Sequence, residues 1–556
     1  MTNRLYYGDN LDVLRDHIAS DTIDLVYLDP PFNSNANYNI LFKSPAGKAA
    51  DSQIEAFEDT WHWNDKAEAA FHDVMTSGNT DVAELLRAMR GFLKENDMMA
   101  YLAMMAVRLI ELHRVLKPTG SLYLHCDPTA SHYLKLLLDG VFGPHGFLNE
   151  IVWKRTSAHN SAKRFGPVHD TIFFYAKTTD YVWNPAYQAI PQETIDQWYN
   201  NVEKETGRRF NRADLTAPGK RSGASGATWR GRDVTAKNRH WAVPGFLKLG
   251  DVSATEALNE LDRRGRLYWP AKDGGMPMLK RYLDESTGIA ALDVMSDIQP
   301  LNNVAKERLG YPTQKPLALL ERIIAASSNE GDVVLDPFCG CGTAVDAAQK
   351  LGRQWIGIDV THLSIGLIER RMKDRYGEDL PYEVVGTPND TDSALKLAGE
   401  EPHQFQYWIT QAIGGQPFQG GRKGMDRGID GYIYFTKTGD TLGKSSTEAA
   451  IISVKAGQRV GVAMVRDLKG VMEREKADIG IFVCVIQPTR EMEREAAAAG
   501  VYTDPGTGQT YPRLQIYTLA EYFAGLRPKV PMLDRQAGYK KAGRADPTEG
   551  RQGSLL

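Results

Sequence analysis

Residues 332–359, which read DVVLDPFCGCGTAVDAAQKLGRQWIGID, decide the fold of this chain. The first four residues, 332–335, form a short run that is typical of a buried strand in a parallel sheet. A turn with two glycines follows, and residues 343–352 then predict a helix that ends at a glycine. Residues 354–358 predict a second strand, and Asp359 comes directly after it. This order of elements predicts an α/β fold that binds a nucleotide-like ligand at the ends of its strands.

The glycine turn has the composition of a ligand cradle. Gly340 and Gly342 allow the backbone to approach a ligand closely, and Asp359 can accept hydrogen bonds from ribose hydroxyls. Two details favour S-adenosylmethionine over a dinucleotide. The preceding residues 336–338, Asp-Pro-Phe, suit an amino-acid moiety, and Val345 replaces the third glycine of the dinucleotide pattern. For a Gly-x-Gly turn taken alone, a purely structural role is the alternative.

A second motif, Asp29-Pro30-Pro31-Phe32, follows the apolar run Ile23–Leu28 near the N-terminus. The run predicts a buried strand, and Asp29 stands at its C-terminal end, where open α/β sheets place their ligands. The two prolines fix φ and lack N–H groups, so they keep the loop rigid and leave carbonyl groups available. Such a motif has no role in hydride transfer, which is the third reason to exclude a dinucleotide.

This second motif supplies what methylation of an exocyclic amine requires. The amino group of adenine or cytosine is a poor nucleophile because its lone pair is delocalised into the ring. Asp29 and the carbonyl of Pro30 can accept its two N–H bonds and stabilise the charge that develops on nitrogen, while Phe32 stacks on the base. The base must leave the double helix to reach such a pocket. A proline turn with Asp29 as a helix cap is the alternative when the motif is taken alone.

In this order, the two motifs resemble the β group of DNA amino-methyltransferases, which modify adenine N6 or cytosine N4. The resemblance covers roughly residues 4–375 and is strongest to the modification subunits of type III restriction systems and their solitary relatives. Four further segments match in sequence order: YGDN at 7–10, GSLYLHCD at 120–127, HDTIFFY at 169–175 and YPTQKP at 311–316.

The resemblance implies a Rossmann-like, S-adenosylmethionine-dependent methyltransferase sheet with particular site residues. The implied catalytic residues are Asp29, Pro30, Pro31 and Phe32. The implied cofactor-binding residues are Asp9, Thr313, Gln314, Lys315, Asp336, Phe338, Gly340, Gly342, Thr343 and Asp359. Asp29 favours adenine N6, because cytosine N4 enzymes more often carry serine there, and cytosine N4 is the alternative. Phe32 replaces the commoner tyrosine, which keeps the stacking and removes a hydroxyl contact.

Residues 186–300 break the β/α rhythm between a catalytic part at 1–185 and a cofactor-binding part at 301–385. From 201 to 240 the chain carries ten Lys or Arg against four Asp or Glu, a local charge of +6. Basic residues interleaved with tryptophans are typical of a DNA-contacting surface, and the β group carries its target-recognition region at this position. The candidate DNA-binding residues are Arg221, Arg230, Arg232, Lys237 and Arg239. A solvated loop region with a few packed tryptophans is the alternative.

Residues 395–530 predict a second, smaller α/β domain. A hairpin with Asp430 and Lys455 resembles the Mrr-like branch of the PD-(D/E)xK nucleases, in which carboxylates bind Mg²⁺ and the lysine stabilises attacking hydroxide. Ser453 stands where that family has Glu, Asp or Gln, and serine is a weak Mg²⁺ ligand. Glu401 is a further candidate acid on a helix. Mg²⁺ is therefore expected only if this domain is an active nuclease, and a degenerate fold that binds DNA or a partner is the alternative.

Length and composition agree with two or three soluble domains. The chain has 556 residues, a formal net charge of −4 and 42% hydrophobic residues. No spacing of its four cysteines suggests a zinc site, so no resident metal is expected in the methyltransferase part. No apolar run is long enough to span a membrane, and the first residues do not read as a signal peptide, which favours a cytoplasmic protein. Residues 535–556 are expected to be disordered.

Together these features predict a site-specific DNA methyltransferase that acts on adenine N6 in double-stranded DNA. A bifunctional restriction–modification enzyme is one alternative, and a chain that only binds DNA is another. The sequence leaves open a homodimer, a separate restriction subunit and an RNA substrate.

Overall fold

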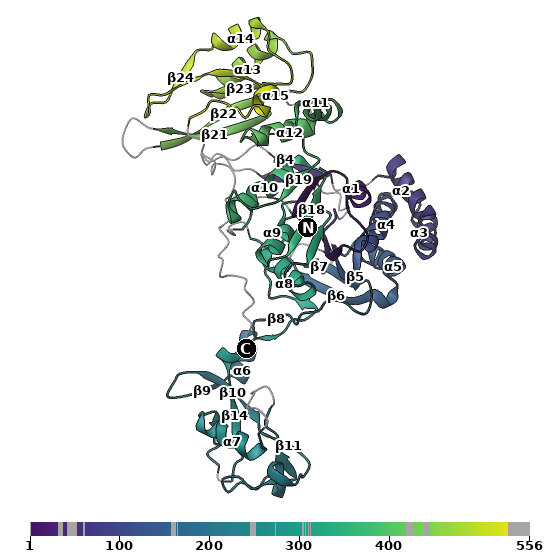
Figure 1. Cartoon of the computed structure of the whole chain (residues 1–556), viewed down its shortest axis with the longest axis vertical. Coiled ribbons are helices and arrows are strands. Elements are labelled where there is room, and N and C mark those ends of the chain that lie inside the picture. The colour runs from purple at the N-terminus through teal and green to yellow at the C-terminus, as the bar shows by residue number, and fades with distance from the viewer. Residues whose placement is uncertain are drawn as a thin grey trace. The chain divides into compact units, whose positions relative to one another are not determined.

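In the computed structural model, the chain forms two compact units, Met1–Asn184 with Asp293–Leu556 and, separately, Pro185–Leu292 (Figure 1). The structure describes residues 2–31, 37–41, 53–58, 62–156, 163, 165–244, 252–272, 274–302, 305, 307–309, 311, 313–418, 428–438 and 445–531. The predictions for Phe32 and for the tail at 535–556 therefore lie outside the described residues.

A nine-stranded, mostly parallel sheet forms the centre of the first unit. Its strands, in spatial order, are β16 (Val294–Met295), β6 (Phe147–Lys154), β7 (His169–Ala176), β5 (Leu116–Cys126), β2 (Ile23–Leu28), β17 (Val333–Asp336), β18 (Gln354–Asp359), β1 (Arg4–Tyr7) and β19 (Glu383–Val385). β7 runs antiparallel to β5 and β6. The two motif strands are neighbours, with Leu25 of β2 paired to Val334 of β17 in parallel register. Their following loops therefore emerge at the same edge of the sheet, as expected of an α/β fold.

Helices cover both faces of this sheet, which explains the continuous apolar sequences of its central strands. All six residues of β2 are buried. Val26 and Leu28 join a core on one face, whereas Leu25 and Tyr27 join a core on the other. The helices of the first face are α1 (Asn10–His17), α2 (Asp65–Thr76), α3 (Thr80–Leu93), α4 (Asp97–Val115) and α5 (Ser131–Phe142), and those of the second are α8 (Leu317–Ser327), α9 (Thr343–Lys350) and α10 (His362–Tyr376) (Figure 1).

Two smaller elements, a hairpin and a short turn, complete this part of the chain. β3 (Asn37–Leu41) and β4 (Gln53–Glu58) form an antiparallel hairpin, and a 3-10 turn spans Pro144–Gly146. The long helix α4 begins after Asn96, whose side chain accepts a hydrogen bond from the Met99 backbone N–H at 2.9 Å.

The second unit, Pro185–Leu292, is built on short strands. Its four-stranded sheet has the order β13 (Leu267–Tyr268), β14 (Met278–Tyr282), β10 (Arg209–Asp214) and β9 (Asn201–Val202). β11 (Thr216–Pro218) pairs with β12 (Arg239–Trp241), and β8 (Tyr187–Gln188) pairs with β15 (Ile289–Ala290). The chain thus enters through β8 and leaves through its antiparallel partner β15. The remaining elements are α6 (Gln192–Trp198), α7 (Ala254–Arg263) and 3-10 turns at Gly223–Gly226, Thr235–Lys237 and Leu283–Glu285.

Two of the tryptophans that the sequence places among basic residues belong to the core of this unit. Trp229 and Trp241 are 5% and 2% exposed and pack with Leu258 and Leu279. Their indole N–H groups donate to Asn259 and to the backbone carbonyl of residue 227, at 2.9 and 2.8 Å. These rings therefore stabilise the unit, whereas Trp198 and Trp269, 57% and 37% exposed, reach its surface.

The C-terminal domain, residues 391–531, has a five-stranded mixed sheet. Its order is β20 (Gln416–Pro417), β21 (Gly431–Thr438), β22 (Ser445–Lys455), β23 (Gly480–Cys484) and β26 (Leu514–Thr518). One face packs against α11 (Thr391–Glu400), α12 (Pro402–Ala412) and α15 (Leu519–Phe523), and the other against α13 (Val462–Glu475) and α14 (Arg490–Ala497). β24 (Val501–Thr503) and β25 (Thr510–Pro512) form a separate ribbon. Among the described residues, no helix combines the length and apolar character that crossing a membrane requires.

Candidate functional site

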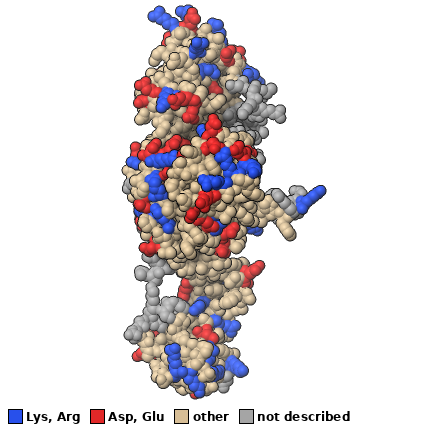
Figure 2. Space-filling view, turned by 90° about the vertical axis from the view of Figure 1, so that its right-hand side faces the viewer, with Lys and Arg blue, Asp and Glu red and all other residues tan. Residues whose placement is uncertain are grey.

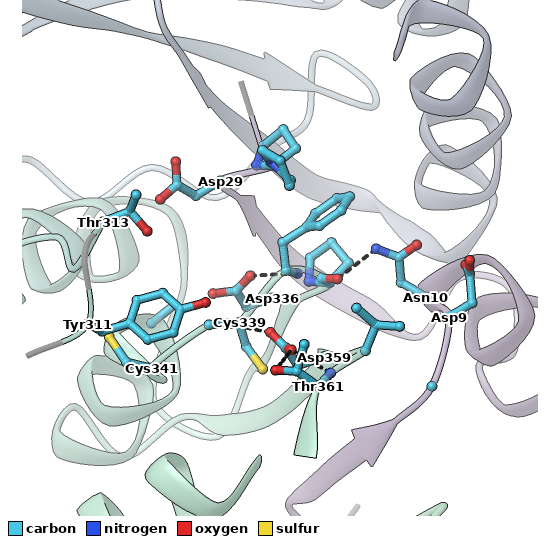
Figure 3. Close-up of a pocket in the computed structure, with 18 of the residues that line it drawn as sticks. Asp9, Asn10, Asp29, Tyr311, Thr313, Asp336, Cys339, Cys341, Asp359 and Thr361 are labelled. Carbon is cyan, nitrogen blue, oxygen red and sulfur yellow. Dashed lines mark hydrogen bonds between the residues drawn. The ribbon is translucent and has the colours of Figure 1, made fainter. Parts of the chain in front are cut away.

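A pocket of about 750 Å³ opens at the carboxyl edge of the central strands. The ends of four neighbouring strands contribute to it: β1 through Asp9, β2 through Asp29, β17 through Asp336 and β18 through Asp359. Figure 3 shows these four carboxylates around one space. The two motifs lie about three hundred residues apart in sequence, and the parallel pairing of β2 with β17 brings them together.

At this edge, one carboxylate oxygen of Asp29 accepts a hydrogen bond and the other does not. Its Oδ2 accepts a hydrogen bond from Lys315 Nζ at 2.5 Å, and the two side chains are only 16% and 10% exposed. Its Oδ1 is buried and has no hydrogen-bond partner in the described part of the chain. A buried carboxylate oxygen in this state is costly unless a ligand supplies the missing donor. The arrangement therefore leaves an acceptor ready for an N–H group that enters the pocket.

The prolines after Asp29 fit the same picture. Pro30 and Pro31 line the pocket and have no N–H to donate. Phe32, the predicted stacking residue, lies outside the described residues. Behind the motif, the hydroxyl of Tyr27 lies 3.0 Å from His125 Nδ1. Burial, with help from the Asp29 carboxylate, raises the pKa of Tyr27 well above its ordinary value, so this hydroxyl stays protonated.

The glycine loop is held in shape by its own carboxylates. Gly340 and Gly342 have φ of +51° and +75°, a region that favours glycine. The backbone N–H of Gly340 donates to Asp359 Oδ2 at 2.9 Å, and the N–H of Phe338 donates to Asp336 Oδ1 at 3.1 Å. Burial raises the pKa of Asp336 well above its ordinary value and raises that of Asp359. Both groups thus hold the loop and also face the pocket.

Asp359 also fixes the turn after its own strand. Its Oδ1 accepts hydrogen bonds from the N–H and the hydroxyl of Thr361, each at 2.9 Å (Figure 3). An ionised carboxylate has about four lone-pair sites. Gly340 and Thr361 supply three of the donors to Asp359, and a side-chain hydrogen bond from Ser364 also lowers its pKa, so the contact with ribose hydroxyls stays a prediction.

Two residues that sequence reasoning missed lie beside Asp9. The guanidinium of Arg108 donates to both Asp9 oxygens, at 2.7 and 3.0 Å, and to Asn10 Oδ1 at 2.6 Å. Asn10 in turn donates to the carbonyl of Pro337 at 2.8 Å (Figure 3). This chain of bonds ties α4 and the start of α1 to the loop after β17. The sequence did contain a sign of this role, because Arg108 is a single arginine in the otherwise apolar middle of α4.

The side chains of two other predicted cofactor-binding residues form hydrogen bonds with other protein groups. Gln314 lines the pocket, but its amide donates to the carbonyl of residue 307 at 2.6 Å and accepts from the N–H of Leu309 at 2.7 Å. The hydroxyl of Thr343 accepts from buried Arg371 at 3.3 Å. Thr313 also lines the pocket, near Asp29 in Figure 3. The Gln314 and Thr343 side chains therefore shape the pocket wall, whatever their backbones contact.

Residues of the C-terminal domain form part of the same pocket. Glu401, His403, Gln404 and Tyr407, from the start of α12, belong to its lining. Glu401 was predicted as an acid of the nuclease-like site, but its Oε2 accepts a hydrogen bond from the Tyr7 hydroxyl at 3.3 Å. The Glu401 side chain therefore contacts the methyltransferase part, and a role as a nuclease acid stays a prediction.

The candidate DNA-binding residues lie in the second unit, and their surroundings differ. Arg221 and Lys237 are exposed. Arg230 is also exposed but pairs with Asp262, and Arg239 donates to Thr216. Arg232 is half-buried. Residues 185–292 carry seventeen Lys or Arg against thirteen Asp or Glu, a formal charge of +4 in a chain of −4. Lys and Arg gather on the face of this unit seen at the foot of Figure 2.

The nuclease-like residues meet at the β21–β22 hairpin. Asp430 Oδ2 accepts from the N–H of Val454 at 2.6 Å and from the hydroxyl of Ser453 at 3.3 Å. Lys455 follows at the end of β22 and is half-buried. Within the described ranges, no group of three or more His, Cys, Asp or Glu side chains could hold a metal ion. Ser453 thus bonds to Asp430 from the position where the resembled family has a second metal ligand.

Comparisons with known proteins agree with this architecture. A family model described as DNA methylase matches residues 23–369, and one described as restriction endonuclease matches residues 397–503. The type II methyltransferase M.EcaI of Enterobacter cloacae is 31% identical over 309 residues, 55% of this chain and 65% of its own length. The StyLTI Mod subunit, of a type III restriction-modification enzyme of Salmonella typhimurium, is 27% identical over 365 residues, 63% and 50% of the two chains.

A shorter match links the chain to the DNA adenine methyltransferase YhdJ of Escherichia coli, 46% identical over 76 residues, 14% of this chain and 26% of that one. The matched segments thus span less than two thirds of each relative's own length. The DNA methylase model, in contrast, covers more than half of the present chain. The chain therefore belongs to the DNA methylase family of amino-methyltransferases, with the β-group order of motifs, and carries a C-terminal Mrr-like domain.

Proposed function

We propose that this chain transfers a methyl group from S-adenosylmethionine to adenine N6 at specific sites in double-stranded DNA. The observation that carries the proposal is the pairing of two features in one pocket. Asp29 has a buried oxygen without a donor, and the glycine loop of a nucleotide-type site follows the neighbouring strand. One feature suits an amine that must be activated, and the other suits the donor of its methyl group.

The residues present fit S-adenosylmethionine. The cavity of about 750 Å³ lies within the range of small-molecule sites. The positive φ of Gly340 and Gly342 brings loop backbone to its surface, and Asp336 and Asp359 offer acceptors for the amino-acid and ribose groups. When bound, this cofactor supplies an electrophilic methyl group on a sulfonium. The protein's contribution is to hold the two reactants in line, which accounts for a large part of the rate in such reactions.

Asp29 is proposed to act on the amine of the flipped base. Its Oδ1 and the carbonyl of Pro30 would accept the two N–H bonds, which draws the nitrogen lone pair out of conjugation. The carboxylate would then stabilise the positive charge that develops as the nitrogen attacks. Lys315 fixes the orientation of Asp29 through the other oxygen. The proton leaves to water after transfer, because the methylated ammonium is strongly acidic, and His125, held behind Tyr27, supports the motif without touching the amine.

Two observations favour adenine over cytosine. The motif carries an aspartate at residue 29, and the resemblance described above associates serine with cytosine N4 enzymes. A relative with 46% identity over 76 residues bears the name of a DNA adenine methyltransferase. Cytosine N4 is the alternative, since the reaction on nitrogen is the same for both bases.

The second unit is proposed to contact DNA. Its formal charge is +4, whereas the rest of the chain carries −8. Exposed Arg221 and Lys237 are the side chains best placed to neutralise phosphates, because Arg230 and Arg239 already have protein partners. Arg232 keeps its predicted role as a contact near them. Base-specific contacts would add the sequence preference.

The C-terminal domain is a second candidate for activity. The match to a restriction endonuclease model and the joint position of Asp430 and Lys455 on one hairpin favour a bifunctional enzyme. Ser453 argues against it, because its hydroxyl bonds to Asp430 where a nuclease needs a second carboxylate for Mg²⁺. We therefore propose that this domain binds DNA or a restriction partner without cutting.

The decisive test is transfer of tritiated methyl groups from labelled cofactor to unmethylated genomic DNA, followed by identification of the labelled nucleoside. We expect N6-methyl-2′-deoxyadenosine. Label on cytosine would replace the base assignment, and, in a parallel reaction with total RNA, label on RNA but not on DNA would replace the substrate class. Absence of cofactor binding would overturn the proposal as a whole.

A further inference from the structure

One wall of the pocket comes from outside the methyltransferase sheet. Glu401, His403, Gln404 and Tyr407 stand at the start of α12, the helix that packs on the sheet of the C-terminal domain. Phe405 and Trp408 on the same helix are buried in that domain's core. A single helix therefore contributes to the C-terminal core on one side and to the pocket on the other.

Several contacts hold α12 against the methyltransferase part. The side chain of Gln404 accepts from the backbone N–H of His362 at 3.2 Å. Gln411 donates to the carbonyl of Leu363 at 3.4 Å. The approach of the two helices is close at Gly366 of α10, where an added Cβ would lie 2.7 Å from the Gln411 side chain. Tyr407 packs in a small apolar cluster together with Tyr311, Cys341, Leu363 and Leu367.

Glu401 lies at the Asp359 end of the pocket. It accepts from the hydroxyl of Tyr7, and Tyr7 pairs with Asp359 between the adjacent strands β1 and β18. The Tyr7 ring stacks on His362, with centroids 3.7 Å apart. Burial, then the carboxylates of Glu401 and Asp359, raise the pKa of Tyr7, so it remains a donor. Two carboxylates thus border the end of the pocket proposed for the ribose.

We propose that α12 is part of the cofactor site, with Glu401 accepting hydrogen bonds from the adenosine moiety. This inference rests on the proposed function. It has a thermodynamic consequence, because a ligand that contacts two parts stabilises the contact between them, and the contact strengthens the ligand's binding by the same factor. Docking of the Mrr-like domain and occupancy of the cofactor site then favour each other.

The same helix also reaches the nuclease-like hairpin. Gln406, on the other side of α12, lies with its amide nitrogen 3.5 Å from the carbonyl of Asp430. Residues two positions apart on a helix point in different directions, so Gln404 and Gln406 face the two sites separately. The position of α12 therefore connects the state of the cofactor pocket with the start of β21.

The test measures binding of S-adenosylhomocysteine to the full-length chain by calorimetry. Glu401→Gln should weaken binding about five- to tenfold, because glutamine keeps an acceptor oxygen but removes its charge, a loss about the size of one ordinary hydrogen bond. The matched control is Glu400→Gln, because Glu400 is the exposed neighbour at the end of α11 and does not line the pocket. Gly366→Leu displaces the Gln411 side chain from its bond to Leu363 without altering a pocket side chain, and should also weaken binding, by about threefold.

Hydrogen exchange provides an independent measurement. Amides of α12 should exchange more slowly in the wild-type chain when S-adenosylhomocysteine is bound. If the wild type binds ligand while Glu401→Gln and Gly366→Leu bind as tightly as the control, and α12 gains no protection, the inference is wrong and the proposed function stands. If the wild type binds no S-adenosylhomocysteine, the proposed function is wrong, and the inference that rests on it is wrong as well.

Discussion

Replacement of Asp29 by asparagine tests the proposed chemistry with almost no change in shape. Lys315 donates to one oxygen of this side chain, and the other oxygen is the unpartnered acceptor. In the variant, the ammonium of Lys315 attracts the amide oxygen, because a lysine can only donate. The amide NH₂ then occupies the place of Oδ1. A donor would therefore face the N–H groups of the base where an acceptor is required.

The size of the effect follows from this geometry. A preorganised group aimed at charge that develops in the transition state contributes about 3–4 kcal/mol, or two to three powers of ten in rate. The variant loses the negative charge and also reverses the direction of the hydrogen bond. We therefore expect methyl transfer to fall by about a thousandfold in single-turnover conditions. The affinity for S-adenosylhomocysteine should stay within about twofold, because Asp29 does not belong to the glycine loop.

The assay is tritium transfer to unmethylated genomic DNA at saturating enzyme, with calorimetry of cofactor binding on the same preparation. Asp12→Asn is a matched control, because Asp12 is exposed on α1 and does not line the pocket. The reasoning is refuted if Asp29→Asn keeps more than about a tenth of the wild-type rate, or if its rate loss is matched by an equal loss of cofactor affinity.

Three further outcomes are expected. Arg108→Met should lower the free energy of unfolding by about 1–3 kcal/mol, because loss of the buried guanidinium removes the donor to the Asn10 side-chain oxygen. An unchanged urea midpoint at equal slope would contradict this. Arg221→Glu combined with Lys237→Glu should weaken DNA binding and reduce the slope of log affinity against log salt concentration by about two. The control Lys272→Glu, exposed in the same unit, should change both quantities less. An equal effect of the control would count against the named pair. Wild-type protein with Mg²⁺ should leave unmethylated DNA intact, and cleavage that disappears in Lys455→Ala would establish the bifunctional alternative.

The sequence predicted the α/β fold because its signals are local. Consecutive residues in the segment 332–352 predict a strand, a glycine turn and a helix. The structure contains these elements as β17, the following loop and α9. The same holds for Asp29 at the end of β2, since an apolar run ends there. Methyl transfer requires the amine site and the cofactor site to be close together, and the family resemblance implies the same. The structure brings β2 and β17 together through the parallel pairing of Leu25 with Val334.

Contacts between segments that lie far apart in the sequence could not be predicted from these local signals. Arg108 reaches Asp9 from the middle of α4, and nothing in the neighbouring residues says which carboxylate it meets. Glu401 was assigned to the nuclease-like site because a helix acid is expected there. Its partner, Tyr7, lies 394 positions away, and only the packing of α12 on α10 brings them together. The roles of the individual site residues remain predictions until the variants are measured.

The paired crossing at β8 and β15 has a consequence for how this enzyme family diversifies. Both chain connections to residues 185–292 pass through one two-stranded neck, with Gln188 opposite Ile289. A segment that begins and ends at neighbouring points can be exchanged between genes as a cassette, because the flanking backbone keeps its spacing. New target preferences would then spread by recombination at the neck, while the chemistry of the sheet is inherited unchanged.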